Sequence, residues 1–374
     1  MEKPAIFNLE TKSLSDIKRE YKINQIIDTY KELLEDLFLV RNPKYKFENN
    51  YQKEFNNFLK EHSRGKSLEF CGNWVFFPWS KTLVHYLEND SHQEVRTARN
   101  KNLILPNEQK KFYNFKVGVT GLSVGSHGAL TTALMGGGKL MKLADPDTIS
   151  PTNLNRMRFD FTQVGMNKAE LVAQYIYQLD PYSDIHIYSE GINEKNLGKF
   201  LDGLDILIEE LDDIEIKFKI RQEAKKRKIP VVMVTDNGDN VIVDVERFDL
   251  DPDLPIFYGN LDGLDLKKIK ESPKKLFEAM AKIIDVSLVP PRVLNSVMEV
   301  GKTIYSWPQL ASAATLSGVV IAYIIRKIAL GEQIKEGKYE VNLESAIDPD
   351  YDNKKDSRIK SAQNFLKSIN NDKT

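Results

Sequence analysis

The chain has 374 residues, of which 41% are hydrophobic and 29% charged, and its formal net charge is −1 at pH 7. This length accommodates one large domain with an appendage, or two domains, and the composition is that of a globular protein. A charge so close to zero argues against the strongly basic surface that nucleic acids or acidic membranes attract, so we expect neither partner. The single cysteine, Cys71, leaves no disulfide within the chain and no cysteine-ligated zinc site, so we expect no zinc and a cytoplasmic location.

The first 110 residues are expected to form an accessory region of mixed helices and strands. Apolar residues between positions 13 and 39 recur at helical spacing and predict a helix with Ser13 or Ser15 as its N-cap. The aromatic run at 73–79 predicts a strand of this region's core.

A strand–turn–helix–strand pattern begins near residue 116. The apolar run 117–120 is followed at once by the small-residue turn 121–126, GLSVGS, and then by an apolar helical pattern. Glycines at 136–138 interrupt that pattern, and a second apolar run, 140–144, ends at Asp145. This order is that of the βαβ unit that binds a nucleotide.

The turn and the acid have complementary predicted roles. Gly121 allows the sharp turn, and the positive end of the following helix favours a phosphate. Asp145, about 24 residues further on, is placed for a ribose hydroxyl. The pattern is not a full G-x-G-x-x-G, so a tight turn of any doubly wound sheet is the alternative. The residues expected to form the phosphate cradle are Ser123, Val124, Gly125 and Ser126.

Strands and helices continue to alternate after residue 168, which predicts an α/β fold with a doubly wound, mostly parallel sheet. We expect this nucleotide-binding domain to span residues 111–347, followed by a loose polar tail at 348–374. The apolar run 310–325 is shorter than the ~20 residues that span a bilayer and predicts a buried helix. The predicted helices are 169–179, 214–227, 273–284 and 309–329, and the predicted strands are 185–188, 205–208, 230–235, 241–248 and 338–343.

Two polar segments follow the second strand. They are DPDTISPTNLNR at 145–156 and VGMNK at 164–168. They resemble the D-x-D, S/T-N-L-x-R and V-G-x-x-K signature of the ThiF/MoeB family of ubiquitin-like-protein activating enzymes, a resemblance that covers about residues 111–330. It implies an ATP- and Mg²⁺-dependent adenylyltransferase that activates a carboxylate as an acyl-adenylate. The implied carboxylate is the C-terminus of a ubiquitin-like carrier protein or of a peptide, and a small metabolite is the alternative.

The resemblance also implies roles for individual residues. Asn153, Arg156 and Lys168 would contact the triphosphate, and Asp212 in the run EELDD would bind the magnesium ion. Family members act as homodimers in which an arginine from the neighbouring subunit completes the site. Arg99 is the expected arginine, and the alternatives to it are Arg96 and Lys101.

The chain departs from the family pattern in three places. Glu209 and Asp213 replace an aspartate and an asparagine around Asp212, Lys217 stands where an arginine is usual, and no cysteine follows the nucleotide-binding segment. We therefore expect a protein that adenylates a carboxylate without carrying the acyl group itself. One alternative is an NAD(P)- or FAD-binding oxidoreductase, although it would give the NLNR and VGxxK segments no role. Another is a non-catalytic nucleotide-binding scaffold, which the missing cysteines and Lys217 favour.

Overall fold

The computed structural model describes residues 1–264, 269 and 273–371. The chain divides into two compact units. The first consists of residues 1–113, 133–139 and 174–183, and the second of residues 114–132, 140–173 and 184–374. The predicted boundaries near 110 and 347 stay predictions, because the units interleave along the chain.

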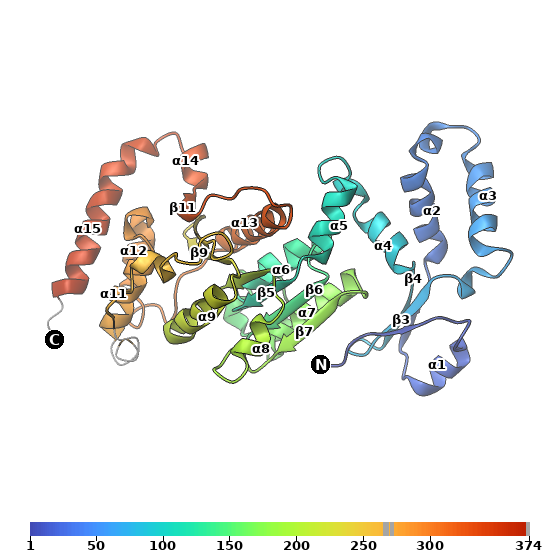
Figure 1. Cartoon of the computed structure of the whole chain (residues 1–374), viewed down its shortest axis with the longest axis horizontal. Helices are drawn as coiled ribbons and strands as arrows, with labels where there is room; N and C mark the ends of the chain where they lie inside the picture. Colours follow the sequence, from blue (N-terminus) through green and yellow to red (C-terminus); the bar gives the residue numbers. More distant parts are fainter. Residues whose placement is uncertain (265–268, 270–272, 372–374) are drawn as a thin grey trace. The chain divides into compact units, whose positions relative to one another are not determined.

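The first unit contains a four-stranded sheet in the order β1-β3-β4-β2, with helices beside it (Figure 1). The predicted continuous helix over residues 13–39 is wrong. Ser13 does cap a helix, since its hydroxyl accepts from the Asp16 amide at 3.2 Å, but residues 25–27 pair in parallel with β4 and interrupt the helix. The elements are β1 (Ala5–Phe7), α1 (Leu14–Glu20), β2 (Gln25–Ile27), α2 (Tyr30–Arg41), α3 (Tyr51–Ser63), β3 (Asn73–Phe77), β4 (Thr82–Tyr86), α4 (Asn89–Arg96) and α5 (Pro106–Asn114).

The second unit is built on a seven-stranded sheet in the order β11-β10-β9-β8-β5-β6-β7. The five strands from β9 to β7 run parallel, and β10 and β11 add an antiparallel edge. The strand order reverses at β5, which confirms the predicted doubly wound, mostly parallel α/β sheet. The strands are β5 (Val117–Thr120), β6 (Leu140–Ala144), β7 (Asp184–Tyr188), β8 (Ile206–Glu209), β9 (Val231–Asn237), β10 (Asn240–Glu246) and β11 (Gly337–Val341).

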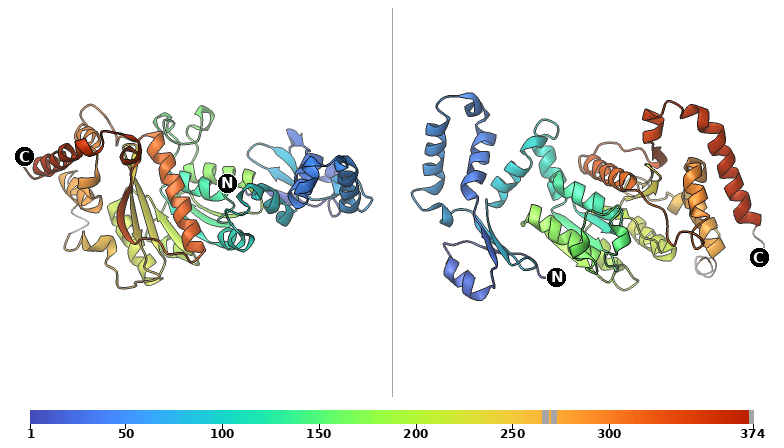
Figure 2. Two further views of the ribbon diagram at one scale, coloured as in Figure 1. Left: turned by 90° about the horizontal axis from the view of Figure 1, so that it is seen from above. Right: turned by 180° about the vertical axis from the view of Figure 1, so that it is seen from behind.

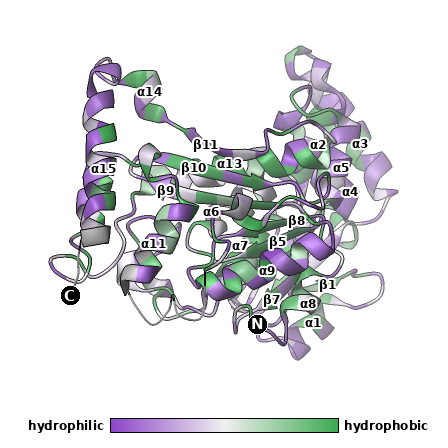
Figure 3. Cartoon of the chain, turned by 60° about the vertical axis from the view of Figure 1, so that its left-hand side comes forward, coloured by the Kyte–Doolittle hydropathy of each residue, from purple (hydrophilic) through white to green (hydrophobic). Residues whose placement is uncertain are grey.

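The central strands are buried on both faces, as an apolar parallel sheet requires. Figure 3 shows them in the hydrophobic colour. Helices α8 (Leu197–Leu201) and α9 (Ile214–Lys226) share one apolar cluster with β6, β8 and β9, and the ring of Phe200 lies against Gly118. Val119 faces the opposite side and contacts the start of α6 (Gly125–Leu134). Right-handed connections then put α6 and α7 (Lys168–Leu179) on the same face.

Helix α13 (Ala311–Ala329) lies against β9 and β10 and beside α6 (Figure 2). Gly318 of α13 meets α6 so closely that an added Cβ would lie 2.7 Å from the carbonyl oxygen of His127. By length and composition α13 could cross a membrane, but half of its most apolar window is buried within the protein. The prediction of a buried helix is therefore confirmed for the face of α13 that packs against the sheet and α6.

The last part of the chain is helical. The elements there are α11 (Pro273–Ile283), α12 (Pro291–Val297), α14 (Leu343–Ile347) and α15 (Lys355–Asn371). The predicted loose tail is wrong for residues 355–371, because Ala362 and Phe365 of α15 are buried in an apolar cluster with Val286 and Leu294. The final three residues of the predicted tail lie outside the described part of the chain.

Candidate active site

The turn after β5 is packed against the end of β8. Gly121 has φ +73°, and a Cβ at this position would lie 2.1 Å from the carbonyl oxygen of Glu210. A side chain at Gly125, the first residue of α6, would lie 2.8 Å from Val119. The turn therefore requires glycine at both ends for steric reasons, and its predicted role as a phosphate cradle at the start of α6 stays a prediction.

The hydroxyls of the two serines in this turn serve different contacts. The Ser126 hydroxyl donates to the Ser123 carbonyl at 2.9 Å and is used inside the turn. The Ser123 hydroxyl accepts from Nε of Arg156 at 3.3 Å. Of the predicted cradle residues, Ser123 therefore makes a side-chain link to the next segment of the site, whereas Ser126 shapes the helix start.

Asp145 ends β6 and holds the turn in place. Its carboxylate accepts from the Leu122 amide at 2.6 Å and from the Asp147 amide at 2.8 Å. Nζ of Lys168 lies 3.9 Å from the Asp145 carboxylate and 2.8 Å from the Asp147 carboxylate. Burial raises the pKa of Asp145, and the charge of Lys168 opposes that rise.

Asp147 is a site residue that the sequence reasoning missed. Its side chain is 66% exposed, whereas that of Asp145 is 5% exposed. The Asp147 carboxylate can therefore reach a ligand with little rearrangement, and the ribose contact of Asp145 stays a prediction. The D-x-D spacing was the available signal.

The two polar segments pair with each other through short backbone contacts. The amide of Gly165 donates to Ile149 at 2.8 Å, and the amide of Ile149 donates to Met166 at 2.9 Å. The Asn153 side chain accepts from the Ser150 amide at 3.0 Å. In this structure Asn153 thus shapes its own loop, and its predicted phosphate contact stays a prediction.

Arg156 links the turn after β5 to this loop. Besides Ser123, its guanidinium donates to the Thr152 carbonyl at 3.2 Å and to Oδ1 of Asn155 at 2.9 Å. Its carbonyl accepts from Nε2 of His127 at 2.7 Å, and burial lowers the pKa of that histidine to about 4. The neutral imidazole of His127 therefore anchors Arg156 from the α6 side.

Asp212 lies in the exposed loop after β8. Partial desolvation raises the pKa of its carboxyl group, and the positive charges of Lys217 and Lys168 oppose that rise. The negative charge of Asp147 acts in the same direction as the desolvation. The two carboxylates of Asp212 and Asp147 therefore influence each other beside Lys168.

Both carboxylates have the chemistry of a magnesium ligand. Mg²⁺ is typically held by one or two carboxylates together with phosphate oxygens and water, and Asp212 and Asp147 offer two accessible carboxylates. Among the described residues no group of three histidine, cysteine or acidic side chains forms a complete metal cage. A magnesium ion at these carboxylates would need further ligands, which the phosphates of a bound nucleotide could supply. Asp212 as a magnesium ligand stays a prediction.

Lys217 belongs to a buried cluster of charged side chains at the start of the Asp212 loop. Its Nζ donates to Glu209 at 3.0 Å, and Arg221 pairs with Glu209 and also, at 2.6 Å, with Glu246. Burial alone would raise the pKa of Glu209, but Arg221 and Lys217 hold it below its usual range. Glu209 in turn accepts from the Leu211 amide at 2.7 Å, so this cluster fixes the start of the Asp212 loop.

Asp236, at the end of β9, is a second residue that the sequence reasoning missed. Its carboxylate accepts from the Ser317 hydroxyl at 3.0 Å and from Nε2 of Gln309 at 3.1 Å. Burial raises its pKa to about 6, and Ser317, Gln309 and the charge of Arg156 oppose that rise. Asp236 thereby ties the segment before α13 to the carboxyl-end edge of the sheet.

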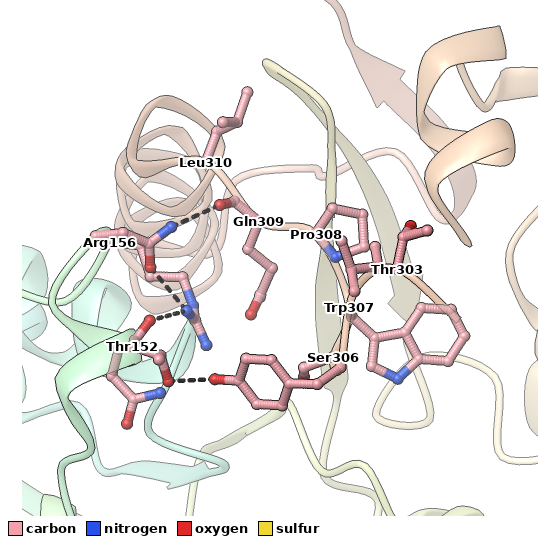
Figure 4. Close-up of a pocket in the computed structure, with 12 residues that line it drawn as sticks. Thr152, Arg156, Thr303, Ser306, Trp307, Pro308, Gln309 and Leu310 are labelled. Carbon is pink, nitrogen blue, oxygen red and sulfur yellow. Dashed lines mark hydrogen bonds between the residues drawn. The ribbon is translucent and has the colours of Figure 1, made fainter. Parts of the chain in front are cut away.

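We call residues 303–310, which precede α13, the strap. The Tyr305 hydroxyl donates to Oγ1 of Thr152 at 2.5 Å, and Nδ2 of Asn155 donates to the Gln309 carbonyl at 2.9 Å. Between the strap and the loop that carries Arg156 lies a pocket of about 510 Å³ (Figure 4). The pocket opens beside the guanidinium of Arg156.

A family model matches the part of the chain that contains these residues. The model of the ThiF family matches residues 97–238, which include the turn after β5, the Arg156 loop, Lys168 and Asp212. Residues 97–238 are a ThiF-family domain.

Three relatives of the ThiF domain have sequences similar to this chain. An uncharacterized protein of Mycobacterium tuberculosis is 37% identical over 282 residues, which cover 75% of this chain and 39% of that protein. The tRNA threonylcarbamoyladenosine dehydratase of Escherichia coli is 28% identical, over 33% of this chain and 46% of the relative. The molybdopterin-synthase adenylyltransferase of Haemophilus influenzae is 26% identical, over 31% of this chain and 47% of the relative. The matched regions thus span less than half the length of each relative.

A solved structure of the same E. coli dehydratase in complex with ATP also resembles this chain. The TM-score is 0.45 at 18% sequence identity, and the match covers 63% of this chain and 94% of the other.

The three cations expected to act across a subunit interface differ in their surroundings. Arg99 and Lys101 are exposed. The side chain of Arg96 is 13% exposed and donates to the Ala133 carbonyl and to Gln93. Arg96 therefore holds its own unit together, and of the three expected cations Arg99 and Lys101 are the accessible ones.

Proposed function

We propose that the protein binds ATP with Mg²⁺ and transfers the adenylyl group to a carboxylate. An oxygen of the carboxylate attacks the α-phosphorus of ATP, and a new oxygen–phosphorus bond forms. The bond between the α-phosphorus and the bridging oxygen breaks, and pyrophosphate leaves with its electron pair. The product is an acyl-adenylate.

One observation supports this proposal above the others: three kinds of group that the reaction needs lie at the carboxyl ends of adjacent strands. The start of α6 follows β5, a lysine–aspartate pair follows β6, and exposed Asp212 follows β8. Catalysis of this transfer rests on alignment and charge stabilisation more than on a base. The name of the H. influenzae relative, an adenylyltransferase, agrees with the proposal.

Each site residue then has a role. The amides at the start of α6 would receive the phosphates, and Lys168 and Arg156 would offset the negative charge of the triphosphate. Asp212, with Asp147, would hold the Mg²⁺ ion, which supplies further charge stabilisation at the leaving pyrophosphate. Asp145 would keep the turn in shape and place Lys168.

The partners of the reaction are part of the same proposal. We infer that the acid is the C-terminus of a ubiquitin-like carrier protein or a peptide, and that the protein works in the cytoplasm as a homodimer. Neither a membrane nor a nucleic acid is required for this chemistry. Arg99 of one subunit would complete the site of the other, with Lys101 as the alternative.

The experiment that tests the proposal is ATP–pyrophosphate exchange. The protein is incubated with ATP, Mg²⁺ and labelled pyrophosphate, with and without candidate carrier proteins and peptides. We expect label to enter ATP only when an acid substrate is present. ATP binding without exchange for any acid would favour a nucleotide-binding scaffold, and tighter binding of NAD(P) or FAD than of ATP would contradict the proposal.

A further inference from the structure

The pocket beside Arg156 has two walls of different chemistry. One wall is the loop of residues 152–156, which offers hydroxyl, amide and guanidinium groups. The other is the strap, whose side chains in the pocket include Tyr305, Trp307 and Leu310. These three apolar side chains are 76%, 44% and 48% exposed. A ligand that covers them would bury apolar surface, which is favourable in water.

The charge of the pocket selects an anion. Among the described residues that line it, Arg156 alone carries a formal charge at pH 7. The nearby carboxylate of Asp236 accepts from Ser317 and Gln309, and its negative charge offsets part of the charge of Arg156. A ligand with one negative end and an apolar body therefore matches the pocket on both walls.

Arg156 also sets the position of that negative end. Its Nε contacts Ser123 in the phosphate turn, and its guanidinium faces the pocket. A carboxylate beside Arg156 would therefore lie next to the place proposed for the phosphates of ATP. Figure 4 shows the guanidinium between Thr152 and the strap.

The size of the pocket bears on the residue that carries the carboxylate. About 510 Å³ is within the usual range of sites that enclose a small organic ligand. A terminal glycine would leave the faces of Tyr305 and Trp307 in water, whereas a phenylalanine or leucine side chain would cover them. The ring of Tyr305 is 76% exposed, so it can contact the residues before the terminal one as well.

We propose that the acid substrate is the C-terminus of a peptide or protein that ends in a large apolar or aromatic residue. Tyr305, Trp307 and Leu310 are its specificity-determining residues, and Arg156 receives its carboxylate. This inference rests on the proposed adenylation, because it names the acid that the same site would activate.

The first test compares acids in ATP–pyrophosphate exchange. The acids are the tetrapeptides Ala-Ala-Ala-Phe, Ala-Ala-Ala-Leu and Ala-Ala-Ala-Gly, together with N-acetyl-phenylalanine. We expect kcat/KM for the Phe and Leu peptides to exceed that of the Gly peptide at least about tenfold, the scale of one apolar side chain in a pocket. The Phe peptide should also exceed N-acetyl-phenylalanine. A Gly peptide as good as the Phe peptide, or equal rates for the peptide and the short acid, would overturn the inference.

A binding measurement separates this inference from the adenylation proposal. Trp307 is the only tryptophan of the second unit, since Trp74 and Trp79 belong to the first, so a ligand in the pocket should change its fluorescence. We expect the Phe peptide to bind in the absence of ATP and its C-terminal amide to bind at least about tenfold more weakly, because the amide cannot pair with Arg156. Binding of this kind without any exchange would refute adenylation alone. Equal binding of the acid and the amide would refute the pocket's proposed ligand.

Variants of the strap complete the test. Leu310→Ala and Trp307→Ala should raise KM for the Phe peptide about tenfold, while KM for ATP and for the Gly peptide changes less than about twofold. Ile347→Ala is the matched control, because Ile347 is 77% exposed on α14 and lies outside the pocket. It should change none of these constants. Equal losses for the Phe and Gly peptides in the strap variants would mean that the strap only supports the fold.

Discussion

At the scale of single residues, the site depends on contacts that small changes can break selectively. Gly121 combines a positive φ with a close approach to Glu210, whereas Gly203 has a similar φ of +70° but open space around its Cβ position. A comparison of alanine variants at the two glycines therefore separates the cost of a left-handed backbone from the cost of a steric clash.

Gly121→Ala should lower the free energy of unfolding by more than Gly203→Ala, whose cost should be about 1–3 kcal/mol from the left-handed backbone alone. Gly121→Ala should also abolish the rise in melting temperature that ATP with Mg²⁺ gives the wild type. Denaturant unfolding and thermal shift measure both effects. Equal losses of stability and retained ATP stabilisation in the Gly121 variant would show that the turn does not form the phosphate cradle.

Lys168→Ala should reduce adenylation about 10²-fold or more, the scale of one lost electrostatic partner of a transition state. Lys142→Met is a matched control, because Lys142 is also a buried lysine of the second unit but donates to the carbonyls of Lys199 and Asp202. It should lower stability and leave the KM for ATP unchanged. Pyrophosphate exchange with both variants measures the difference, and similar exchange rates would remove Lys168 from the site.

The carboxyl group of Asp236 makes stability depend on pH. Burial raises its pKa from 3.8 to about 6, so the folded state holds this proton more tightly than the unfolded chain does. Its contribution to stability is therefore most favourable below pH 3.8, falls as the pH rises towards about 6 and is constant above that. The stability of Asp236→Asn relative to the wild type should rise between pH 4 and about 6 and then level off. Urea unfolding at several pH values measures this difference, and a difference independent of pH would mean that the pKa of Asp236 is the same in the folded and unfolded states.

At the scale of elements, the sequence predicts most accurately the strands that are buried on both faces. Strands β5 and β6 begin and end at the predicted residues, because parallel strands covered on both faces are continuous apolar runs bounded by glycine or acid. Prediction failed where pairing partners are distant in sequence. Strand β2 breaks the predicted helix because β4, more than 50 residues later, supplies its hydrogen bonds.

The candidate site could be predicted from the sequence only where a local signature marks its residues. Gly121, Lys168 and Arg156 follow a local signature, and the structure brings Arg156 to Ser123 and Lys168 to Asp145. The pocket could not be predicted, since its two walls meet through contacts such as that of Asn155 with the Gln309 carbonyl, 154 residues apart. No local spacing encodes such a contact.

The close packing of α13 on α6 gives a prediction at this scale. Gly318→Ala removes a poor helix former, which alone would stabilise a helix by about 1 kcal/mol, but the new methyl would lie within 2.7 Å of His127. We expect a lower melting temperature and weaker ATP binding, since His127 anchors Arg156. Thr315→Ala, at an exposed position of the same helix, should be nearly neutral. A Gly318 variant as stable as the wild type would mean that α6 and α13 can separate at no cost.

At the scale of the whole molecule, the proposed dimer predicts complementation between inactive variants. Arg99→Ala and Lys168→Ala should each be inactive, the first in its partner's site and the second in its own. After equal mixing and subunit exchange, about half of the dimers are mixed and each has one intact site, so activity should recover to roughly a quarter of the wild type. Pyrophosphate exchange before and after mixing measures the recovery. No recovery despite proven exchange of subunits would show that Arg99 does not act across the interface.

The central claim is that an oxygen of the acid becomes bonded to the phosphorus of AMP. The most direct measurement uses a peptide whose terminal carboxylate carries ¹⁸O, incubated with ATP, Mg²⁺ and the protein, followed by mass spectrometry of the AMP released when water attacks the acyl carbon. Adenylation predicts that each AMP carries one ¹⁸O atom, because the carboxylate oxygen stays on phosphorus. AMP that lacks the label in a reaction that consumes ATP would contradict the proposed function.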